Sequence, residues 1–313
     1  MFYLITILLT VIIWYFYELS KRQTRIVSPG IQLNSKLPHS QEWTLYHNQF
    51  SLCSKKIRVC LAEYAINYKA IHIDLIETGR YEKITRDFLA IPPAATVPVL
   101  LHNGHPIYES HGQIKFLAEQ VDTKNLLVPT DKPLAIIMNK WIKKSSLLCD
   151  KPIKDTKATA GHAAAGLTLP IFAAIISHIS GHKIIEGLLF HRIKKRAVFF
   201  LIIMLRGMRE TLGLKPIQAI STESYASMSD HLDQLELQLL GSAGAWICGK
   251  QFTLADIGMM AILERLREAS WLDLLVEPRP NVSRYWAALK TRNSYQKGCR
   301  GFDHPLVFKS TKR

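Results

Sequence analysis

The chain begins with an apolar stretch that contains no charged residue. Residues Met1–Tyr17 read MFYLITILLTVIIWYFY, and Lys21, Arg22 and Arg25 follow soon after. At about 1.5 Å per residue, a helix of this length spans most of a hydrocarbon core that is about 30 Å thick. Its final aromatic residues suit the level of the lipid headgroups. The pattern therefore predicts a transmembrane anchor over residues 1–19.

A cleaved signal peptide is the competing interpretation of this stretch. Such a peptide has basic residues before its apolar run and small residues at its cleavage site. In this chain the basic residues come after the apolar run instead. Lys and Arg are enriched on the cytoplasmic side of membrane spans. We therefore expect an uncleaved single-pass anchor with the body of the protein facing the cytoplasm.

After the anchor, the polar residues 20–42 contain Pro29, Gly30 and Pro38, which is typical of a linker. Strand and helix patterns then alternate. The expected strands are residues 43–46, 70–74, 97–101 and 106–108, and the expected helices are residues 54–66 and 110–120. The order βαβ, hairpin, helix predicts a thioredoxin-like domain over residues 43–123.

Helical periodicity dominates from Leu134 onward and predicts an all-helical domain over residues 132–302, followed by a tail over residues 303–313. Thr253 and Asp256 stand three residues apart before an apolar run, as in a capping box. The fold class expected is α/β plus all-α, with a transmembrane helix, a thioredoxin-like domain and a helical C-terminal domain.

An unusual segment, residues 151–216, interrupts the helical domain with apolar runs, histidines and basic clusters. One interpretation is a pair of long helices that shape a hydrophobic pocket. A second is a membrane-associated hairpin beside the anchor. A third is a metal site at His178 and His182, but two histidines without a neighbouring carboxylate favour no metal.

Charge and cysteine content narrow the class of partner and the compartment. The formal net charge is +15, which attracts anions. There is no zinc-finger spacing, RNP-type sequence or long basic arm, so a membrane surface is favoured and nucleic acid is not expected. The cysteines are odd in number and form no CxxC pair, which favours a reducing compartment without a disulfide scaffold: Cys53, Cys60, Cys149, Cys248 and Cys299.

Candidate chemistry gathers at the start of the first helix of the body. Cys53 stands between Ser51 and Ser54, where free N–H groups and the positive end of the helix dipole favour an anion. Lys56 and its basic neighbours add positive charge. The plainer interpretations are a helix cap for either serine and a small buried side chain for the cysteine.

Two further segments are suited to hold a small peptide. Val97 precedes Pro98, and a cis bond there would present the backbone N–H and C=O of Val97 to an extended ligand. Glu109 and Ser110 stand at the start of the next helix, where they are suited to receive the ammonium and carboxylate ends of that ligand. A proline that merely begins a strand is the plainer alternative.

Together these segments resemble a known family. Residues 51–58 (SLCSKKIR) resemble the first-helix start of zeta-like glutathione transferases and, more closely, of tetrachlorohydroquinone reductive dehalogenases. Residues 93–100 (PAATVPVL) resemble the segment with a cis proline in that family, and residues 108–110 (YES) resemble its glutathione-gripping Glu/Gln-Ser pair. The resemblance covers about residues 43–302. It departs at Pro92 and at Ala95, where the family usually has Asn and Gly.

The resemblance implies that glutathione is the cosubstrate and that the partner is an apolar or lipid electrophile. It implies a homodimer by analogy. Long insertions also occur in dehalogenase-like transferases and in ganglioside-induced differentiation-associated proteins. The implied catalytic residues are Ser51, Cys53 and Ser54, and the implied glutathione-binding residues are Lys56, Val97, Pro98, Glu109 and Ser110.

Three functions follow from this resemblance as alternatives. The first is a membrane-anchored glutathione transferase, with thiol exchange through Cys53 if the dehalogenase resemblance holds and thiolate stabilisation by Ser51 if it does not. The second is a non-catalytic membrane adaptor with the same fold. The third is a glutathione-dependent lipid peroxidase.

Overall fold

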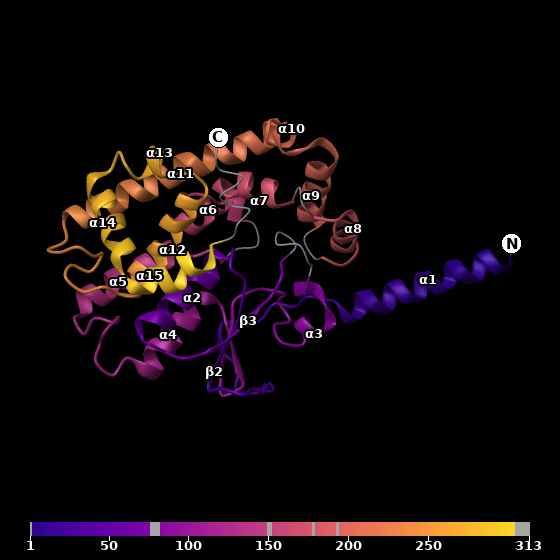
Figure 1. Ribbon diagram of the computed structural model, residues 1–313, viewed down its shortest axis with the longest axis horizontal. Helices are drawn as coiled ribbons and strands as arrows, with labels where there is room; N and C mark the ends of the chain where they lie inside the picture. The colour runs from indigo at the N-terminus through magenta and orange to yellow at the C-terminus, as the bar shows by residue number, and fades with distance from the viewer. Residues whose placement is uncertain (1, 76–81, 149–151, 177–178, 192–193, 304–313) are drawn as a thin grey trace.

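A computed structural model of the protein describes residues 2–75, 82–148, 152–176, 179–191 and 194–303. Figure 1 shows a sheet-containing part and a helical part packed together, with helix α1 (Phe2–Lys21) projecting away from both. Among the described residues, α1 is the one helix long and apolar enough to cross a membrane. A signal sequence would also meet these criteria of length and composition.

The sheet has five strands in the order β1-β5-β4-β2-β3. Strands β2 and β3 are parallel, and the other neighbours are antiparallel. The four strands expected from the sequence are present within about two residues of the expected positions. The bounds are β1 Gly30–Ile31, β2 Trp43–His47, β3 Lys69–His72, β4 Val99–His102 and β5 His105–Tyr108.

Helix α2 connects the sheet to the helical part of the chain. It packs against α4 within the thioredoxin-like part and against α12 and α15 of the helical part. A short turn of 3₁₀ helix, η2, and the short helix α3 lie between β3 and β4. The bounds are α2 Leu52–Glu63, η2 Glu82–Ile84, α3 Arg86–Leu89 and α4 Ser110–Val121.

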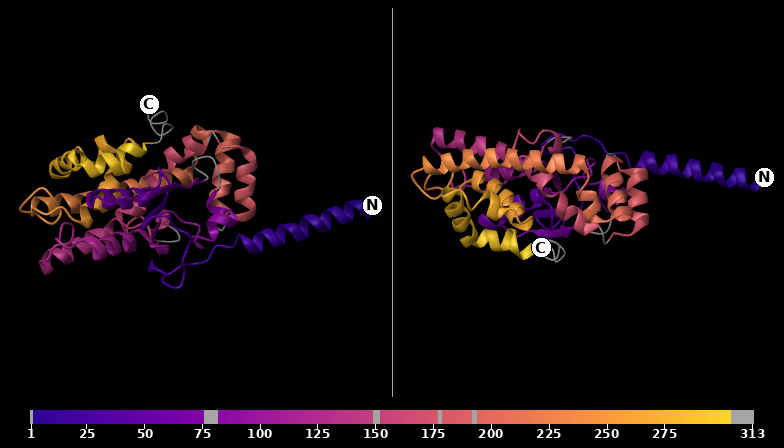
Figure 2. Two further views of the ribbon diagram at one scale, coloured as in Figure 1. Left: turned by 60° about the horizontal axis from the view of Figure 1, so that its bottom comes forward. Right: turned by 90° about the horizontal axis from the view of Figure 1, so that it is seen from above.

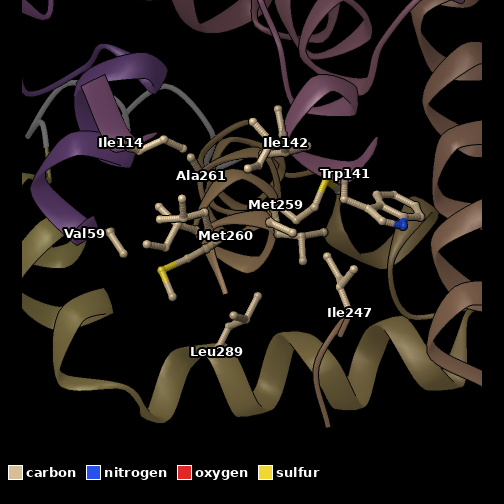
Figure 3. Close-up of a cluster of buried hydrophobic side chains, with 14 of the residues drawn as sticks. Val59, Ile114, Trp141, Ile142, Ile247, Met259, Met260, Ala261 and Leu289 are labelled. Atoms are coloured by element: carbon tan, nitrogen blue, oxygen red, sulfur yellow. The ribbon is translucent and has the colours of Figure 1, made fainter. Parts of the chain in front are cut away.

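Helix α12 forms the centre of the helical part, and every one of its residues except Arg267 is buried. Figure 3 shows Met259, Met260 and Ala261 of α12 surrounded by side chains from both parts of the molecule, among them Val59 and Ile114. One hydrophobic core therefore crosses the domain boundary. The surrounding helices are α5 Lys132–Lys144, α11 Lys215–Leu240, α12 Leu254–Glu268, α13 Leu272–Leu275, α14 Pro280–Thr291 and α15 Asn293–Gly298.

The capping box expected before α12 is present. The N–H of Thr253 donates to Oδ2 of Asp256 at 2.7 Å, and the side chain of Thr253 in turn caps the helix. Tyr285 donates its hydroxyl to Oδ1 of Asp256 at 2.9 Å. Tyr285 and Trp286 are both buried in the core. This network fixes the start of α12 and ties α14 to it.

The described residues of segment 151–216 do not form the pair of long helices that one of the three interpretations offered. They contain five shorter helices, because residues that interrupt a helix recur: Pro170 stands just after a break at Thr168, and Gly207 adopts a positive φ of 81° between α9 and α10. The bounds are α6 Ala160–Leu167, α7 Leu169–Ile176, α8 Gly181–Phe190, α9 Lys194–Arg206 and α10 Met208–Leu212. His178 lies outside the described residues.

These insertion helices build a second, smaller core. Ile84 and Leu89 from the thioredoxin-like part pack in it with apolar side chains of α7, α8 and α9. Tyr15 and Leu19 of α1 pack against the same cluster. Figure 2 shows α1 leaving the body beside these helices. The insertion therefore holds the base of α1.

Polar contacts strengthen this attachment. Glu18 is buried and forms ion pairs with Arg22 of α1 and with Arg86 of α3. Arg22 also pairs with Glu186 of α8 at 2.8 Å, and its guanidinium lies 4.5 Å from the ring centre of Phe190. Part of the segment expected to be a linker is also built into the sheet, since β1 pairs with β5.

Candidate functional site

A cavity of about 480 Å³ lies where the two parts of the molecule meet, and we call it the first cavity. Cys53 at the start of α2, Val97 and Pro98 before β4, and Glu109 and Ser110 at the start of α4 all line it. The fold thus brings five of the eight candidate residues together around one space. They come from three segments that the topology places side by side at the end of the sheet.

The remaining candidates, Ser51, Ser54 and Lys56, do not line the first cavity. Ser51 is the N-cap of α2, and its Oγ accepts the N–H of Ser54 at 3.2 Å. Ser54 is fully buried, and its Oγ accepts the N–H of Asn48 at 3.4 Å. In this geometry Ser51 caps α2, which is the plainer role considered above, and Ser54 ties the loop at Asn48 to the start of the helix.

Cys53 differs from the other cysteines that the structure describes. It is partly exposed, whereas Cys60, Cys248 and Cys299 are buried. Burial raises the pKa of Cys248 to about 11 and that of Cys299 to about 12, and it raises the pKa of Cys60 well above its ordinary value. Because the thiolate is the nucleophile, these three thiols are inert near neutral pH. Cys149 lies outside the described residues.

Lys56 lies beneath the first cavity. It is fully buried, and its Nζ donates to the carbonyl oxygen of Ser145 at 2.5 Å and lies 3.1 Å from Nε2 of His111. Burial lowers the pKa of Lys56 to about 8, and the negative charges of Cys53 and Glu109 act in the opposite direction. Any contribution of Lys56 to a ligand in this cavity is therefore electrostatic.

His111 responds to the same positive charge. Burial lowers its pKa to about 2, with further lowering from Lys56 and Lys115, so the ring is neutral at ordinary pH. A neutral ring can accept a hydrogen bond from Nζ of Lys56 at Nε2. This arrangement orients Lys56 under the start of α2 and leaves its charge uncancelled by the imidazole.

The other basic residues of α2 join the two parts of the molecule instead of facing the cavity. Lys55 forms an ion pair with Glu268 of α12 at 2.5 Å. Arg58 donates to the carbonyl oxygens of Gly298 at 2.8 Å and Asn48 at 3.1 Å. Burial would raise the pKa of Glu268, but the charges of Lys55 and Arg265 outweigh this effect and lower it.

The loop before β4 is held by a buried amide. The Val97–Pro98 peptide bond is cis, as expected from the sequence. Nε2 of Gln113 on α4 donates to the carbonyl oxygens of Pro98 at 2.9 Å and Ile107 at 2.7 Å. These contacts fix the loop relative to α4, and both Val97 and Glu109 border the cavity.

Glu109 has an unusual backbone conformation. Its φ is 68°, in the region that non-glycine residues rarely adopt, and it directly precedes the first turn of α4. Such conformations cluster at binding and catalytic sites. Burial raises the pKa of the Glu109 carboxyl, and Lys56 opposes the rise. A partly buried carboxylate and the free N–H groups of a helix start therefore border the same space.

The segment that follows helix α1 supplies a wall of the first cavity that the sequence did not predict. Thr24, Arg25, Ile26, Val27 and Pro29 line the first cavity. The backbone N–H of Arg25 donates to the carbonyl oxygen of Pro93 at 2.8 Å, which holds this segment against the loop before β4. A polar stretch with proline and glycine offers no local pattern that indicates such a role.

A second cavity of about 290 Å³ adjoins the first, and Thr96, Val97 and Leu147 line both. Its walls are largely apolar and include Ser51, Phe50, Leu52, Ala164, Ala165 and Phe172. Three basic residues, Lys83, Arg196 and Arg265, also line it. The insertion helices α6, α7 and α9 supply much of this wall, so the insertion shapes the second cavity.

A cluster of carboxylates elsewhere has a structural explanation. Glu264, Glu268 and Asp303 lie close enough to one another to suggest cation binding. Lys55, Arg265, Arg267 and Arg300 already form ion pairs with these three carboxylates. The cluster therefore joins α12 to its neighbours through side-chain charges.

Comparison with protein families separates the chain into matched and unmatched parts. The family "Glutathione S-transferase, N-terminal domain" matches residues 50–120, and "Glutathione S-transferase, C-terminal domain" matches residues 218–288. The chain belongs to the glutathione transferase superfamily. Residues 121–217, which include the insertion helices, lie between the two matches, and the N-terminal segment precedes both.

The relatives of this glutathione transferase superfamily member are distant. It is 23% identical over 258 residues to "Glutathione S-transferase TCHQD" of Arabidopsis thaliana, a match that covers 81% of the chain and 88% of the relative. It is 31% identical over 93 residues to maleylacetoacetate isomerase of Mus musculus, which covers 30% of the chain and 43% of that enzyme.

A solved relative supports the fold assignment. The theta class glutathione S-transferase from Xanthomonas axonopodis pv. citri, solved with glutathione bound, superposes with a TM-score of 0.55 at 16% identity. The match covers 83% of this superfamily member and 98% of the solved chain. At this identity the similarity establishes the fold, a thioredoxin-like sheet domain followed by an all-helical domain.

Proposed function

We propose that this protein is a membrane-anchored glutathione transferase that directs the thiolate of glutathione onto an apolar electrophile. The observation that carries the proposal is the first cavity. Cys53, Val97, Pro98, Glu109 and Ser110 line it together, at positions that resemble the glutathione-binding segments of the superfamily. The apolar second cavity adjoins it and provides room for the electrophile.

In this proposal glutathione lies along the first cavity as an extended peptide. Glu109 and Ser110 bind its γ-glutamyl end, and the backbone of Val97 binds its cysteinyl residue. Its sulfur then lies near Cys53 at the start of α2, where the helix dipole and the buried charge of Lys56 favour the thiolate. The positive charge lowers the cost of ionising the thiol.

Cys53 gives the site a second step that a serine in the same place would not allow. The glutathione thiolate first attacks the electrophilic carbon, forming a C–S bond while the leaving group departs. The Cys53 thiolate then attacks the sulfur of this conjugate, and the carbon leaves with the electron pair and takes up a proton. A second glutathione thiolate resolves the mixed disulfide, which releases glutathione disulfide and restores Cys53.

The contacts at the base of α1 support retention of the apolar helix as an anchor. Glu18 and Arg22 form ion pairs with Arg86 and Glu186 on the body, and the following residues line the first cavity. Removal of the helix by cleavage near its end would discard these contacts. A permanent anchor uses them to fix the orientation of the body at the membrane.

The test uses the full-length protein in lipid nanodiscs. Calorimetry with glutathione measures binding, and release of chloride from 1-chloro-2,4-dinitrobenzene in the presence of glutathione measures transfer. Binding together with turnover supports the proposal. The absence of both binding and turnover would contradict the proposal and would favour a non-catalytic adaptor. Sedimentation in detergent tests the homodimer that we expect by analogy with the superfamily.

A further inference from the structure

Helices α8 and α9 carry apolar side chains on their exposed sides as well as on their buried sides. Ile185 and Leu189 of α8 are 56% and 38% exposed, and Val198 and Leu205 of α9 are 42% and 72% exposed. Residues 197–205 of α9 include no polar residue. A helix that is apolar on all sides is typical of a buried core or of a membrane. The exposed side of this helix pair is therefore suited to an apolar environment.

The exposed sides of the two helices belong to one surface. The helices pack against each other, and both turn one side to the small core of the insertion, α8 through Phe190 and α9 through Phe200. Their opposite sides therefore lie on the outside of the insertion. We call this surface the apolar face, and it consists of Ile185, Leu189, Val198 and Leu205.

Helix α1 brings the end of α8 to the level of a membrane. The ring of Phe190 lies 6.4 Å from the ring of Trp14 and 5.9 Å from that of Tyr15. A helix of 20 residues is about 30 Å long, which is no longer than the hydrocarbon core is thick. When α1 spans that core, the side chains near its end lie at the membrane surface, and α8 lies there with them. Figure 1 shows α8 and α9 at the end of the body from which α1 projects, and the views in Figure 2 agree.

Positive charge accompanies the apolar face. Lys194 and Lys195 begin α9 and are both exposed, and Lys195 stands three residues before Val198 on the same side of the helix. Nζ of Lys194 donates to the carbonyl oxygen of Leu189 at 2.7 Å, which places this lysine at the end of α8. Residues 187–209 include no aspartate or glutamate. Exposed apolar side chains flanked by lysines are typical of helices that lie on anionic lipid surfaces.

We propose that the apolar face of α8 and α9 lies in the surface of the bilayer that α1 enters, with Lys195 binding anionic lipid headgroups. This inference rests on the membrane anchor of the proposed function and is independent of the transferase chemistry. The apolar side chains enter the acyl region, while the lysine ammonium stays at the level of the phosphates. The body is then attached to the membrane at two places, which restricts its rotation about α1.

The experiment places a photoreactive residue at single positions of the full-length protein in lipid nanodiscs. The nanodiscs contain equal amounts of phosphatidylcholine and phosphatidylserine. p-Benzoylphenylalanine, which reacts with nearby C–H groups under light, replaces Leu189 or Leu205 on the apolar face. It replaces Leu8 to probe α1, and Leu237 of α11, which is 67% exposed and lies outside the insertion, as the matched control. All four leucines are exposed, so these replacements leave both cores intact.

Mass spectrometry of the irradiated protein gives the fraction that carries a lipid. We expect about tenfold more lipid adduct at positions 189 and 205 than at position 237, because the first two side chains lie among acyl chains. Thermal unfolding followed by circular dichroism checks that each variant is folded. No excess at position 189 over position 237 would overturn the inference.

The identity of the adducts tests the role of charge. At position 189 we expect phosphatidylserine adducts to exceed phosphatidylcholine adducts about threefold. Lys195→Glu should abolish this excess. Lys250→Glu, at an exposed lysine in a turn of the helical part, is the matched control and should preserve it. An excess that survives Lys195→Glu would contradict headgroup binding by Lys195.

The outcomes separate this inference from the proposed function. Adducts at position 8 without an excess at position 189 overturn the inference and leave the anchor intact. Adducts at position 189 without adducts at position 8 support the apolar face and contradict the spanning anchor. Cross-links from position 189 to a second copy of the protein, in place of lipid, would overturn the inference and would assign the apolar face to an interface between copies.

Discussion

The two cavities meet at Val97 but are assembled from different kinds of sequence. The first takes Cys53, Glu109 and Ser110 from the segment that matches the N-terminal family domain. The segment that follows helix α1, which includes Arg25, supplies another wall. The second takes part of its wall from insertion helices outside both family matches, and residues of the N-terminal match such as Phe50 and Ala95 also line it. The difference teaches that short motifs indicate the first cavity, whereas the shape of the second also depends on helices that neither family match covers.

The largest expected effect separates chemistry from binding in the first cavity. Cys53→Ser should reduce thiol exchange by about 10³-fold, because an alcohol cannot form the mixed disulfide. The affinity for glutathione should change by less than about threefold. Formation of glutathione disulfide during turnover of a halogenated substrate is the measurement for exchange, and calorimetry is the measurement for affinity.

Cys248→Ser is the control for this substitution, since Cys248 is buried and does not line either cavity. It should leave disulfide formation at the wild-type rate. Survival of exchange in the Cys53→Ser protein would show that the mixed-disulfide step is wrong and would leave direct transfer as the chemistry of the site.

A second substitution tests whether the cavities bind independently. Glu109→Gln should raise the dissociation constant for glutathione about 30-fold, because a charge-assisted hydrogen bond to the ammonium of the ligand is lost. Glu119→Gln, on the exposed face of the same helix, is the control. The KM for 1-chloro-2,4-dinitrobenzene should be unaffected, and a parallel rise would contradict the division into two subsites.

The reciprocal substitution fills the second cavity. Ala165 lines it without full burial, so Ala165→Phe should occupy space that the electrophile needs and raise its KM about tenfold. The dissociation constant for glutathione should stay at the wild-type value. Ala243→Phe, in an exposed loop, is the control for the added ring. Steady-state kinetics with each substrate varied in turn provide the measurement.

The smallest expected effect is a pH dependence that belongs to the first cavity. Burial holds the pKa of Lys56 at about 8, so the charge beneath the cavity disappears as pH rises through that value. The affinity for S-methylglutathione, which has no free thiol, should fall about threefold between pH 7 and pH 9. Lys56→Met should show the lower affinity at both pH values. An identical pH profile in the two proteins would show that Lys56 does not cause the pH dependence of the affinity.

The lowered pKa of Lys56 makes folding stability depend on pH in the opposite direction from ligand affinity. The pKa of Lys56 is lowered from 10.5 in the unfolded chain to about 8 in the fold, so the unfolded chain binds more protons between these values. The contribution of Lys56 to the free energy of unfolding therefore rises as pH increases from about 8 to 10.5. The affinity for S-methylglutathione therefore falls as pH rises above about 8, while the burial of Lys56 costs less stability.

Local signals in the sequence predicted the frame of the fold well. The strands and the capping box at Thr253 and Asp256 depend on spacing over a few residues, which the sequence displays directly. The insertion was harder, because its apolar runs suggested two long helices while Pro170 and Gly207 break them. The apolar runs of this segment predicted which residues are buried, but they did not predict how long each helix is.

The candidate site was predictable to the extent that it depends on short motifs. Cys53, Val97 and Glu109 lie in such motifs, and the structure places them around one cavity. The sequence predicted that Lys56 adds positive charge to the site, but its burial beside Ser145 at the end of α5 depends on tertiary packing that no local pattern records. The second cavity is lined by residues that lie more than 100 positions apart in the sequence, such as Leu52 and Phe172, and no local pattern records their proximity.

The short strand β1 has a practical consequence for work on this protein. Because residues 24–27 and Pro29 form part of the wall of the first cavity and β1 completes an edge of the sheet, a shortened version that starts at Trp43 would lose both. Binding or activity measured on such a truncated protein would therefore describe an incomplete first cavity.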